Sequence, residues 1–122
     1  MITIELDKPQ VEKIVRVFAE ELVKQLGDQI DEIIWYGSTA RGDAEDGSDI
    51  DVAIICQCDD FGAEDRIWSI AHETSLEHNA LIDARVISQK RFYGEWGRLS
   101  YLADDIQKEG IVIWKKNGVL IA

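Results

Sequence analysis

Two aspartates near the middle of the chain, Asp49 and Asp51, have the residue type and spacing of a metal-binding pair. Residues i and i+2 of a strand point to the same face of a sheet, so these carboxylates would lie about 6–7 Å apart. Like charges at that separation repel unless a cation lies between them. Carboxylates are ligands that Mg²⁺ takes, usually together with substrate phosphates. The pair therefore indicates a metal site, although alone such a pair is more often a solvated strand edge.

A tight turn eleven residues earlier offers a place for those phosphates. The apolar stretch 32–36 ends at Gly37 and Ser38. Their small size lets backbone N–H groups approach an anion closely, particularly where a short helix begins. A Gly-Ser turn is common by itself. The combination of this turn, the aspartate pair and the apolar run 52–55 favours a phosphate site beside a metal site.

Other phosphate or metal motifs fail on the same stretch. The spacing from Gly37 to Gly42 is that of a Walker A loop, but Asp43 stands where that loop requires Lys. An EF-hand with Gly47 at its sixth position would have non-ligating residues at three ligand positions. The motif Arg41-Gly42-Asp43 is also that of an adhesion tripeptide, but it fits better as part of the anion-binding loop.

No zinc or disulfide site is expected. His72 and His78 are six residues apart on one predicted helix and do not share a face at ligand spacing. Cys56 and Cys58 lie one residue apart near a strand end, where bridge geometry is not available. We expect two reduced, partly buried thiols.

The hydrophobic pattern predicts the elements that position the motif. A helix with Asp7 as its N-cap carries one apolar stripe as far as Gly27. Buried strands are expected over 32–36 and 49–56. A helix beginning at 59–60 and a strand over 80–87 follow.

The last part of the chain completes the expected sheet. A helix marked by Leu99, Leu102, Ala103 and Ile106 stops at Gly110, and a strand covers 111–114. The order of elements predicts a single α/β (α+β) domain over residues 1–122, with a mixed four-stranded sheet flanked by helices. The four Trp residues are scattered through different elements, which favours core packing or a partner surface over base stacking.

The charge of the chain excludes several function classes. Its 122 residues include 13 Lys and Arg against 24 Asp and Glu, a net charge of −11. So acidic a domain is a poor binder of nucleic acid or of an anionic membrane. A basic partner, or metal ions that recruit phosphates, suits it better. No apolar run is long enough for a membrane helix and no signal peptide precedes the domain, so we expect a cytoplasmic protein.

The motif resembles that of a known enzyme superfamily. The string Gly-Ser-x-Ala-Arg-Gly at 37–42, followed by Ser-Asp-Ile-Asp-Val at 48–52, is similar to the signature of the DNA polymerase β-type nucleotidyltransferases. It resembles in particular their minimal members, the MNT or MntA-type antitoxins, and is most specific over residues 35–55. The resemblance implies a palm-like nucleotidyltransferase fold.

The resemblance also implies a reaction and its metal ligands. AMP would pass from ATP to an acceptor hydroxyl, with release of pyrophosphate and with two Mg²⁺ ions held by Asp49 and Asp51. A third family carboxylate lies on a later strand in an apolar setting, and Asp83 in Ile82-Asp83-Ala84 matches it. Asp83 would complete the metal shell and accept the proton of the nucleophile.

The same resemblance assigns the phosphate contacts. Gly37 and Ser38 would bind the β- and γ-phosphates, Arg41 would neutralise phosphate charge, and Ser48 would reach a phosphate from the other side. For Arg41 and Ser48 the alternative that they only brace the loop stays open.

The acceptor that the resemblance favours is a tyrosine of a HEPN-domain toxin, which would make the chain an enzymatic antitoxin. Larger superfamily members carry a second domain for the acceptor, and none is expected here, so a homo- or hetero-oligomer would complete the acceptor site. Two alternatives remain open. One is a small-molecule transferase of the aminoglycoside type, which usually has a longer chain. The other is a non-catalytic antitoxin, against which the intact carboxylates weigh.

Overall fold

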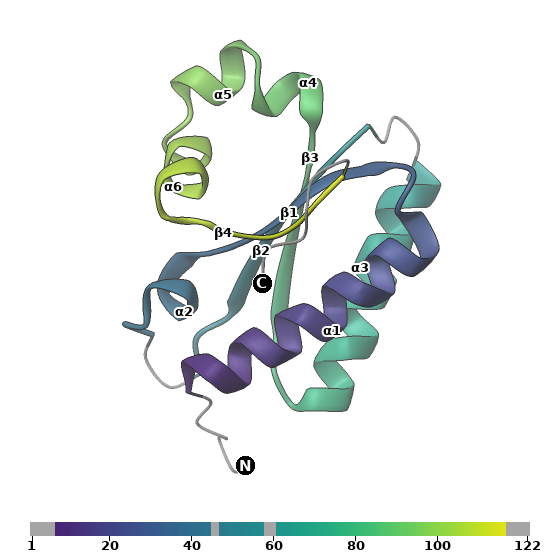
Figure 1. Ribbon diagram of the computed structural model, residues 1–122, viewed down its shortest axis with the longest axis vertical. Coiled ribbons are helices and arrows are strands. Elements are labelled where there is room, and N and C mark those ends of the chain that lie inside the picture. Colours follow the sequence, from purple (N-terminus) through teal and green to yellow (C-terminus); the bar gives the residue numbers. More distant parts are fainter. Residues whose placement is uncertain (1–6, 45–46, 58–60, 117–122) are drawn as a thin grey trace.

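The computed structural model describes residues 7–44, 47–57 and 61–116. In chain order the elements are α1 (Lys8–Leu26), β1 (Ile30–Tyr36), α2 (Gly37–Arg41), β2 (Ile50–Cys56), α3 (Phe61–His78), β3 (Ile82–Ser88), α4 (Gln89–Phe92), α5 (Glu95–Leu99), α6 (Tyr101–Glu109) and β4 (Ile111–Lys115) (Figure 1). No helix within these ranges is both long and apolar enough to cross a membrane.

The sheet is four-stranded, with the strand order β3-β2-β1-β4. β1 is antiparallel to both of its neighbours, whereas β2 and β3 are parallel. The crossover from β2 to β3 runs through α3, as parallel strands require. The prediction of a mixed four-stranded sheet flanked by helices is confirmed.

Helices cover the two faces of the sheet unequally (Figure 1). The long helices α1 and α3 pack on one face through a large apolar cluster that includes Phe18, Leu22 and Ile67. The short helices α4 and α6 supply Phe92 and Ile106 to a smaller cluster on the other face. Since fewer apolar side chains cover this second face, it has room for polar groups at the sheet surface.

The strands alternate between these two clusters. In β2, Val52 and Ile54 belong to the larger cluster, while Ala53 and Ile55 belong to the smaller one. Both faces of β2 are therefore buried over most of its length, which explains its nearly continuous apolar sequence. By the same alternation Asp51 points to the face that α4–α6 only partly cover.

The start of α1 agrees with the sequence analysis. Asp7 accepts a hydrogen bond from the Gln10 N–H at 2.9 Å, and the Gln10 side chain bonds back to the Asp7 N–H, which forms a capping box. The observed β2 begins at Ile50, one residue later than expected, so Asp49 lies just before the strand. The predicted helix start at 59–60 and Cys58 lie outside the described residues, and Cys56 is fully buried.

The region between β3 and β4 was predicted less well. It holds three helices, α4, α5 and α6, where the pattern had indicated one. Leu99 ends α5 and is 76% exposed, so its assignment to the core-facing stripe of the last helix was wrong. The cause is Ser100, whose extended backbone interrupts the helix and whose Oγ accepts a hydrogen bond from the Ala103 N–H, at 3.2 Å.

A partly buried hydrogen bond connects this helical region to the sheet. The Tyr93 hydroxyl, just after α4, donates to Oε1 of Glu32 on β1, and Glu32 is only 8% exposed. Burial and the hydrogen bond to Glu32 raise the pKa of Tyr93 above its ordinary value. A buried carboxylate that loses a donor retains its desolvation cost, so this contact holds α4 against β1.

Tyr93→Phe is therefore expected to lower the free energy of unfolding by about 1–3 kcal/mol, because it leaves Glu32 without its hydroxyl donor. Urea denaturation measures the change. The matched control is Tyr101→Phe, since Tyr101 is 89% exposed and its hydroxyl should contribute less than about 0.5 kcal/mol. Equal effects of the two substitutions would show that the Tyr93–Glu32 bond does not stabilise the fold.

Candidate active site

The neighbouring strands β1, β2 and β3 place Tyr36, Asp51 and Asp83 in one row. Tyr36 pairs with Asp51 across β1 and β2, and Asp51 pairs with Asp83 across β2 and β3. Directly paired residues of neighbouring strands point to the same face of a sheet. Two candidate metal ligands far apart in sequence thus lie next to each other on the face that α4–α6 partly cover.

A backbone contact fixes this register at the entry to the two parallel strands. The Ile50 N–H donates to the Leu81 carbonyl at 2.8 Å, immediately before the first strand pairs. Ile50 then pairs with Ile82, and Asp51 with Asp83. A shift of one residue would move Asp83 to the opposite face of the sheet.

The electrostatic environment of Asp51 shows how closely the acidic groups gather. Its pKa is raised, first by burial and then by the negative charges of Asp83 and Asp49, while Arg85 and Arg41 oppose the shift. Asp51 is half-buried and Asp49 is exposed. A bound cation would relieve this repulsion, because it favours the ionised form of each carboxylate.

The carboxylates do not form a closed metal shell. Within the described ranges, no group of three or more His, Cys, Asp or Glu side chains stands close enough to hold a metal ion. Asp49, Asp51 and Asp83 instead form an open acidic cluster in which the charges interact. Its donors are all carboxylate oxygens, which suit Mg²⁺ with phosphates and water completing the shell.

Gly37 is the point where the chain passes closest to the acidic cluster. It begins α2 with a φ of +82°, a conformation that favours glycine. A Cβ atom at this position would overlap the Asp51 carboxylate at Oδ2. Glycine is thus needed here for two reasons, the backbone angle and the space that Asp51 occupies.

The short helix α2 is anchored on both sides. The Trp35 Nε1–H donates to Thr39 Oγ1 at 2.9 Å in the buried interior. At the other end, the Gly42 and Asp43 N–H groups both donate to the Ser38 carbonyl, at 3.0 and 3.1 Å. These bonds hold the Gly37–Ser38 turn beside β2 without any contribution from a ligand.

A polar hollow of about 340 Å³ lies next to this turn, and Ser38, Arg41, Asp43 and Ser48 line it. Three of the residues that the sequence analysis assigned to phosphate binding therefore meet in one place. Asp43 was not among them. Its presence leaves the hollow with one cationic and one anionic side chain.

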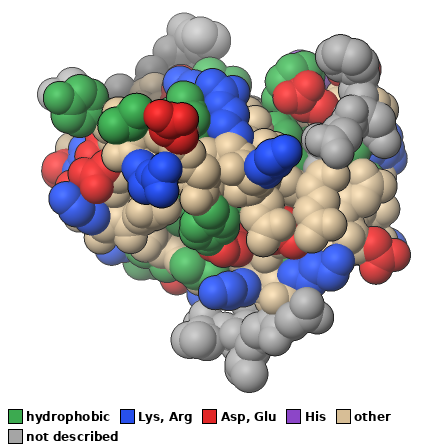
Figure 2. All heavy atoms as spheres, turned by 90° about the horizontal axis from the view of Figure 1, so that it is seen from above, with side chains coloured by type: hydrophobic (Ala, Val, Ile, Leu, Met, Phe, Trp, Pro, Cys, Tyr) green, Lys and Arg blue, Asp and Glu red, His purple; other side chains and the backbone are tan. Residues whose placement is uncertain are grey.

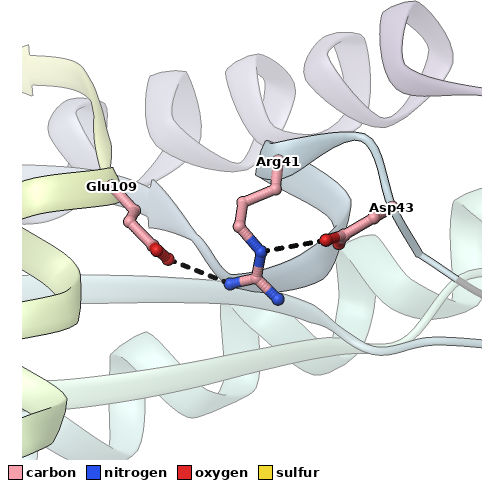
Figure 3. A network of polar contacts seen from close by, with 3 residues as sticks. All are labelled: Arg41, Asp43 and Glu109. Atoms are coloured by element: carbon pink, nitrogen blue, oxygen red, sulfur yellow. Dashed lines mark hydrogen bonds and ion pairs between the residues drawn. The ribbon is translucent and has the colours of Figure 1, made fainter.

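Arg41 is engaged by two carboxylates (Figure 3). Its guanidinium contacts Asp43 at 3.3 Å and Glu109, at the end of α6, at 3.0 Å. Hydrogen bonds to Asp43 and Glu109 raise the pKa of Arg41 further above its ordinary value. These two contacts connect the loop after α2 to the end of α6.

Sequence reasoning missed Glu109, Tyr36 and Arg85. The Tyr36 hydroxyl is buried and makes no hydrogen bond of normal geometry with the described residues. Its pKa is raised to about 12 by burial and by Asp51, with Arg85 opposing and Asp83 adding a smaller increase. Arg85 lies two residues after Asp83, on the same face, and this spacing was the one available signal for it.

Gly37→Ala tests the two constraints on the turn. The left-handed backbone alone should cost about 1–2 kcal/mol, and the overlap with Asp51 should add to that. Gly47→Ala is the matched control, because its φ is +80° and no described atom lies within 4 Å of its Cβ position. Thermal denaturation should show a clearly larger loss for Gly37→Ala; equal losses would mean that Asp51 does not crowd the turn.

Asp51→Asn removes one of the repelling charges and should therefore stabilise the metal-free protein at pH 7. The gain in the free energy of unfolding should be at most about 1 kcal/mol, because solvent screens repulsion between half-exposed charges. The raised pKa means that the folded state binds the Asp51 proton more tightly than the unfolded state. Ionisation therefore opposes folding as the pH rises through the folded-state pKa. The gain in stability should vanish below pH 3.8, the ordinary pKa of this carboxyl group, because Asp51 is then protonated in both states. Denaturation in EDTA at several pH values measures it; a gain unchanged at pH 3 would contradict the repulsion.

The chain is similar to known proteins in both sequence and fold. Residues 15–113 match the family model described as Nucleotidyltransferase domain. The curated relative named Putative protein adenylyltransferase MJ0141, from Methanocaldococcus jannaschii, is 27% identical over 105 residues, which cover 85% of this chain and 99% of the relative. A second one from the same organism, Putative protein adenylyltransferase MJ0604, is 32% identical over 81 residues, 66% of this chain and 77% of the relative.

Solved structures share the fold at low sequence identity. The crystal structure of a putative nucleotidyltransferase from Sulfolobus solfataricus has a TM-score of 0.56 at 19% identity, and the match covers 93% of this chain and 88% of that chain. A mutant of the toxin–antitoxin complex MntA-HpeT also has a TM-score of 0.56, at 16% identity, with 83% of this chain and 73% of that chain covered. The family match spans Tyr36, Asp51, Asp83 and the Gly37–Ser38 turn, and the chain belongs to the nucleotidyltransferase domain family.

Proposed function

We propose that this protein transfers AMP from ATP to a hydroxyl group of a partner protein, with Mg²⁺ as the cofactor. One observation carries the proposal, the alignment of the polar hollow at Ser38, Gly37, Asp51 and Asp83 across neighbouring strands. Across the sheet, this arrangement offers first a place for the leaving pyrophosphate, then a carboxylate that would bind the cation, and then a second carboxylate beside the acceptor. Nucleotide transfer needs these parts in this order.

The leaving group belongs in the polar hollow. Gly37 and Ser38 would bind the β- and γ-phosphates through backbone N–H groups and the Ser38 hydroxyl, while Ser48 donates from the opposite wall. Arg41 would exchange Asp43 or Glu109 for a phosphate oxygen, because both carboxylates already hold its guanidinium at the rim of the hollow. The developing charge on pyrophosphate would thus be met by groups that are already in place.

The acidic cluster serves the reacting centre. Asp49 and Asp51 would hold Mg²⁺, which when bound neutralises charge on the attacking and leaving oxygens. Asp83 would accept the proton of the acceptor hydroxyl as its oxygen bonds to the α-phosphorus. The bond between the α-phosphorus and the bridging oxygen breaks, and pyrophosphate leaves with that electron pair.

The comparisons support a protein acceptor. Both curated relatives are named as protein adenylyltransferases, and the solved relatives include a toxin–antitoxin complex and one such complex with AMP-PNP. The resemblance to MntA-type antitoxins favours a HEPN-domain toxin as the partner and a tyrosine as the acceptor. The net charge of −11 suits association with a basic protein.

Asp49→Asn and Asp51→Asn should each lower AMP transfer to the partner by at least about 10²–10³-fold, because loss of one such charge-stabilising group costs that much. The measurement is transfer of α-labelled ATP to the HEPN-domain partner, with and without EDTA. The control is Asp104→Asn, since Asp104 pairs with Lys108 on the exposed side of α6. It should transfer as the unmodified protein does.

Three results would overturn the proposal. Transfer that persists in EDTA would exclude the cation. Absence of labelled partner, with equal protection from the toxin by the unmodified protein and Asp49→Asn, would indicate an antitoxin that acts by contact. Label on an aminoglycoside without any protein partner would indicate a small-molecule transferase.

A further inference from the structure

The polar hollow at Ser38 and Arg41 is called the phosphate hollow below. A second hollow, of about 470 Å³, begins at Asp83 on the side away from it. Residues 83–87 of β3 line it, together with Glu64 and Trp68 of α3, Arg91 of α4, Trp96 of α5 and Leu102 of α6. We call it the β3 groove. Consecutive strand residues point to opposite faces, and β3 is an edge strand. The groove therefore follows the free edge of the sheet.

The two hollows lie on opposite sides of the acidic cluster. Across the sheet the order is β3 groove, Asp83, Asp51, the Gly37–Ser38 turn and the phosphate hollow. In an in-line displacement the attacking oxygen and the leaving oxygen stand on opposite sides of the phosphorus. If pyrophosphate leaves toward Ser38, the acceptor hydroxyl must therefore arrive from the β3 groove.

The groove is lined by aromatic side chains and by charged side chains of both signs, Glu64 and Asp83 beside Arg85 and Arg91. Trp68 is 49% exposed, a large apolar surface to leave in solvent. The guanidinium of Arg91 stacks over the Trp96 ring, 4.3 Å from its centroid. Arg85 contributes a second cation. The end of the molecule that carries α4 and α5 shows Lys and Arg side chains interspersed with Asp and Glu (Figure 2).

We propose, on the basis of the proposed function, that the β3 groove is the acceptor site and that it takes an aromatic hydroxyl, a tyrosine side chain of the partner. A phenol ring would cover the exposed indole of Trp68 and the Arg91–Trp96 stack, with its hydroxyl at Asp83. A serine is too short to bury this surface.

The test compares three tryptophans. Trp68→Ala and Trp96→Ala should raise the KM for the HEPN-domain partner in AMP transfer by about three- to tenfold, the range expected for one aromatic contact. The KM for ATP and the Kd of AMP-PNP should stay within about twofold of the unmodified values. Trp68→Phe, which keeps a ring, should restore most of the acceptor KM and show that the loss in Trp68→Ala is not a folding defect.

Trp114→Ala is the control, because Trp114 lines a different hollow, between α1 and β4 on the opposite edge of the sheet. It should leave both KM values unchanged. A rise in the ATP KM or the AMP-PNP Kd for Trp68→Ala would assign the groove to the nucleoside instead and overturn the proposal. Unchanged acceptor KM values for Trp68→Ala and Trp96→Ala would overturn it as well.

Failure of the proposed function is separable from failure of this inference. If the unmodified protein labels no partner, the transfer reaction is wrong. The groove is then judged by the Kd of the HEPN-domain partner for the protein saturated with AMP-PNP. A Kd raised by Trp68→Ala but not by Trp114→Ala would retain the groove as the docking site of the partner; equal Kd values would reject it.

Discussion

The parallel pairing of β2 with β3 is the constraint on which the site depends. It sets Asp51 opposite Asp83, although the helix α3 separates them in the chain. The result is unfavourable for the protein by itself, since the charge of Asp83 adds to the burial that already raises the pKa of Asp51. The apolar pairs that continue along these two strands fix the register in spite of this repulsion, because slippage would expose the core residues of β3. The fold thus imposes an electrostatic conflict that a cation can remove.

On the α2 side of the site, by contrast, the turn and Arg41 already have their polar partners within the protein. The α2 turn is held by the Trp35–Thr39 bond and by the Ser38 carbonyl, and Arg41 is held by Asp43 and Glu109. Glu109 is at the end of α6 and therefore connects the loop to the helical region after β3. A ligand that drew Arg41 away would loosen this connection. Under the proposed function, nucleotide binding would consequently be coupled to the position of α6 through this one exposed side chain.

The sequence was informative where local rules decide the structure. The Asp7 cap, the apolar stripe of α1 and the uninterrupted apolar run of β2 each report on their own neighbours, and each was predicted. The Gly37–Ser38 turn and the aspartate pair were recognised because they lie within one short stretch. Asp83 was placed only by resemblance to a family, since its proximity to Asp51 depends on the strand order.

The wrong prediction for Leu99 and the contacts missed at Arg41 and Tyr36 also depend on interactions that local spacing does not determine. Leu99 fits the stripe of α6 by spacing, but the Ser100 hydroxyl offers a competing cap that ends one helix and begins another. The engagement of Arg41 by Glu109 and the burial of the Tyr36 hydroxyl arise between elements distant in sequence. A hydrophobic pattern determines which face of an element is buried, whereas it does not determine which polar groups then meet. In this protein those meetings place Arg41 and its carboxylate partners on the α2 side of the sheet and the aromatic groove on the β3 side. Asp51 lies between them, where burial and the charges of Asp83 and Asp49 raise its pKa, so that a cation bound there would relieve the repulsion.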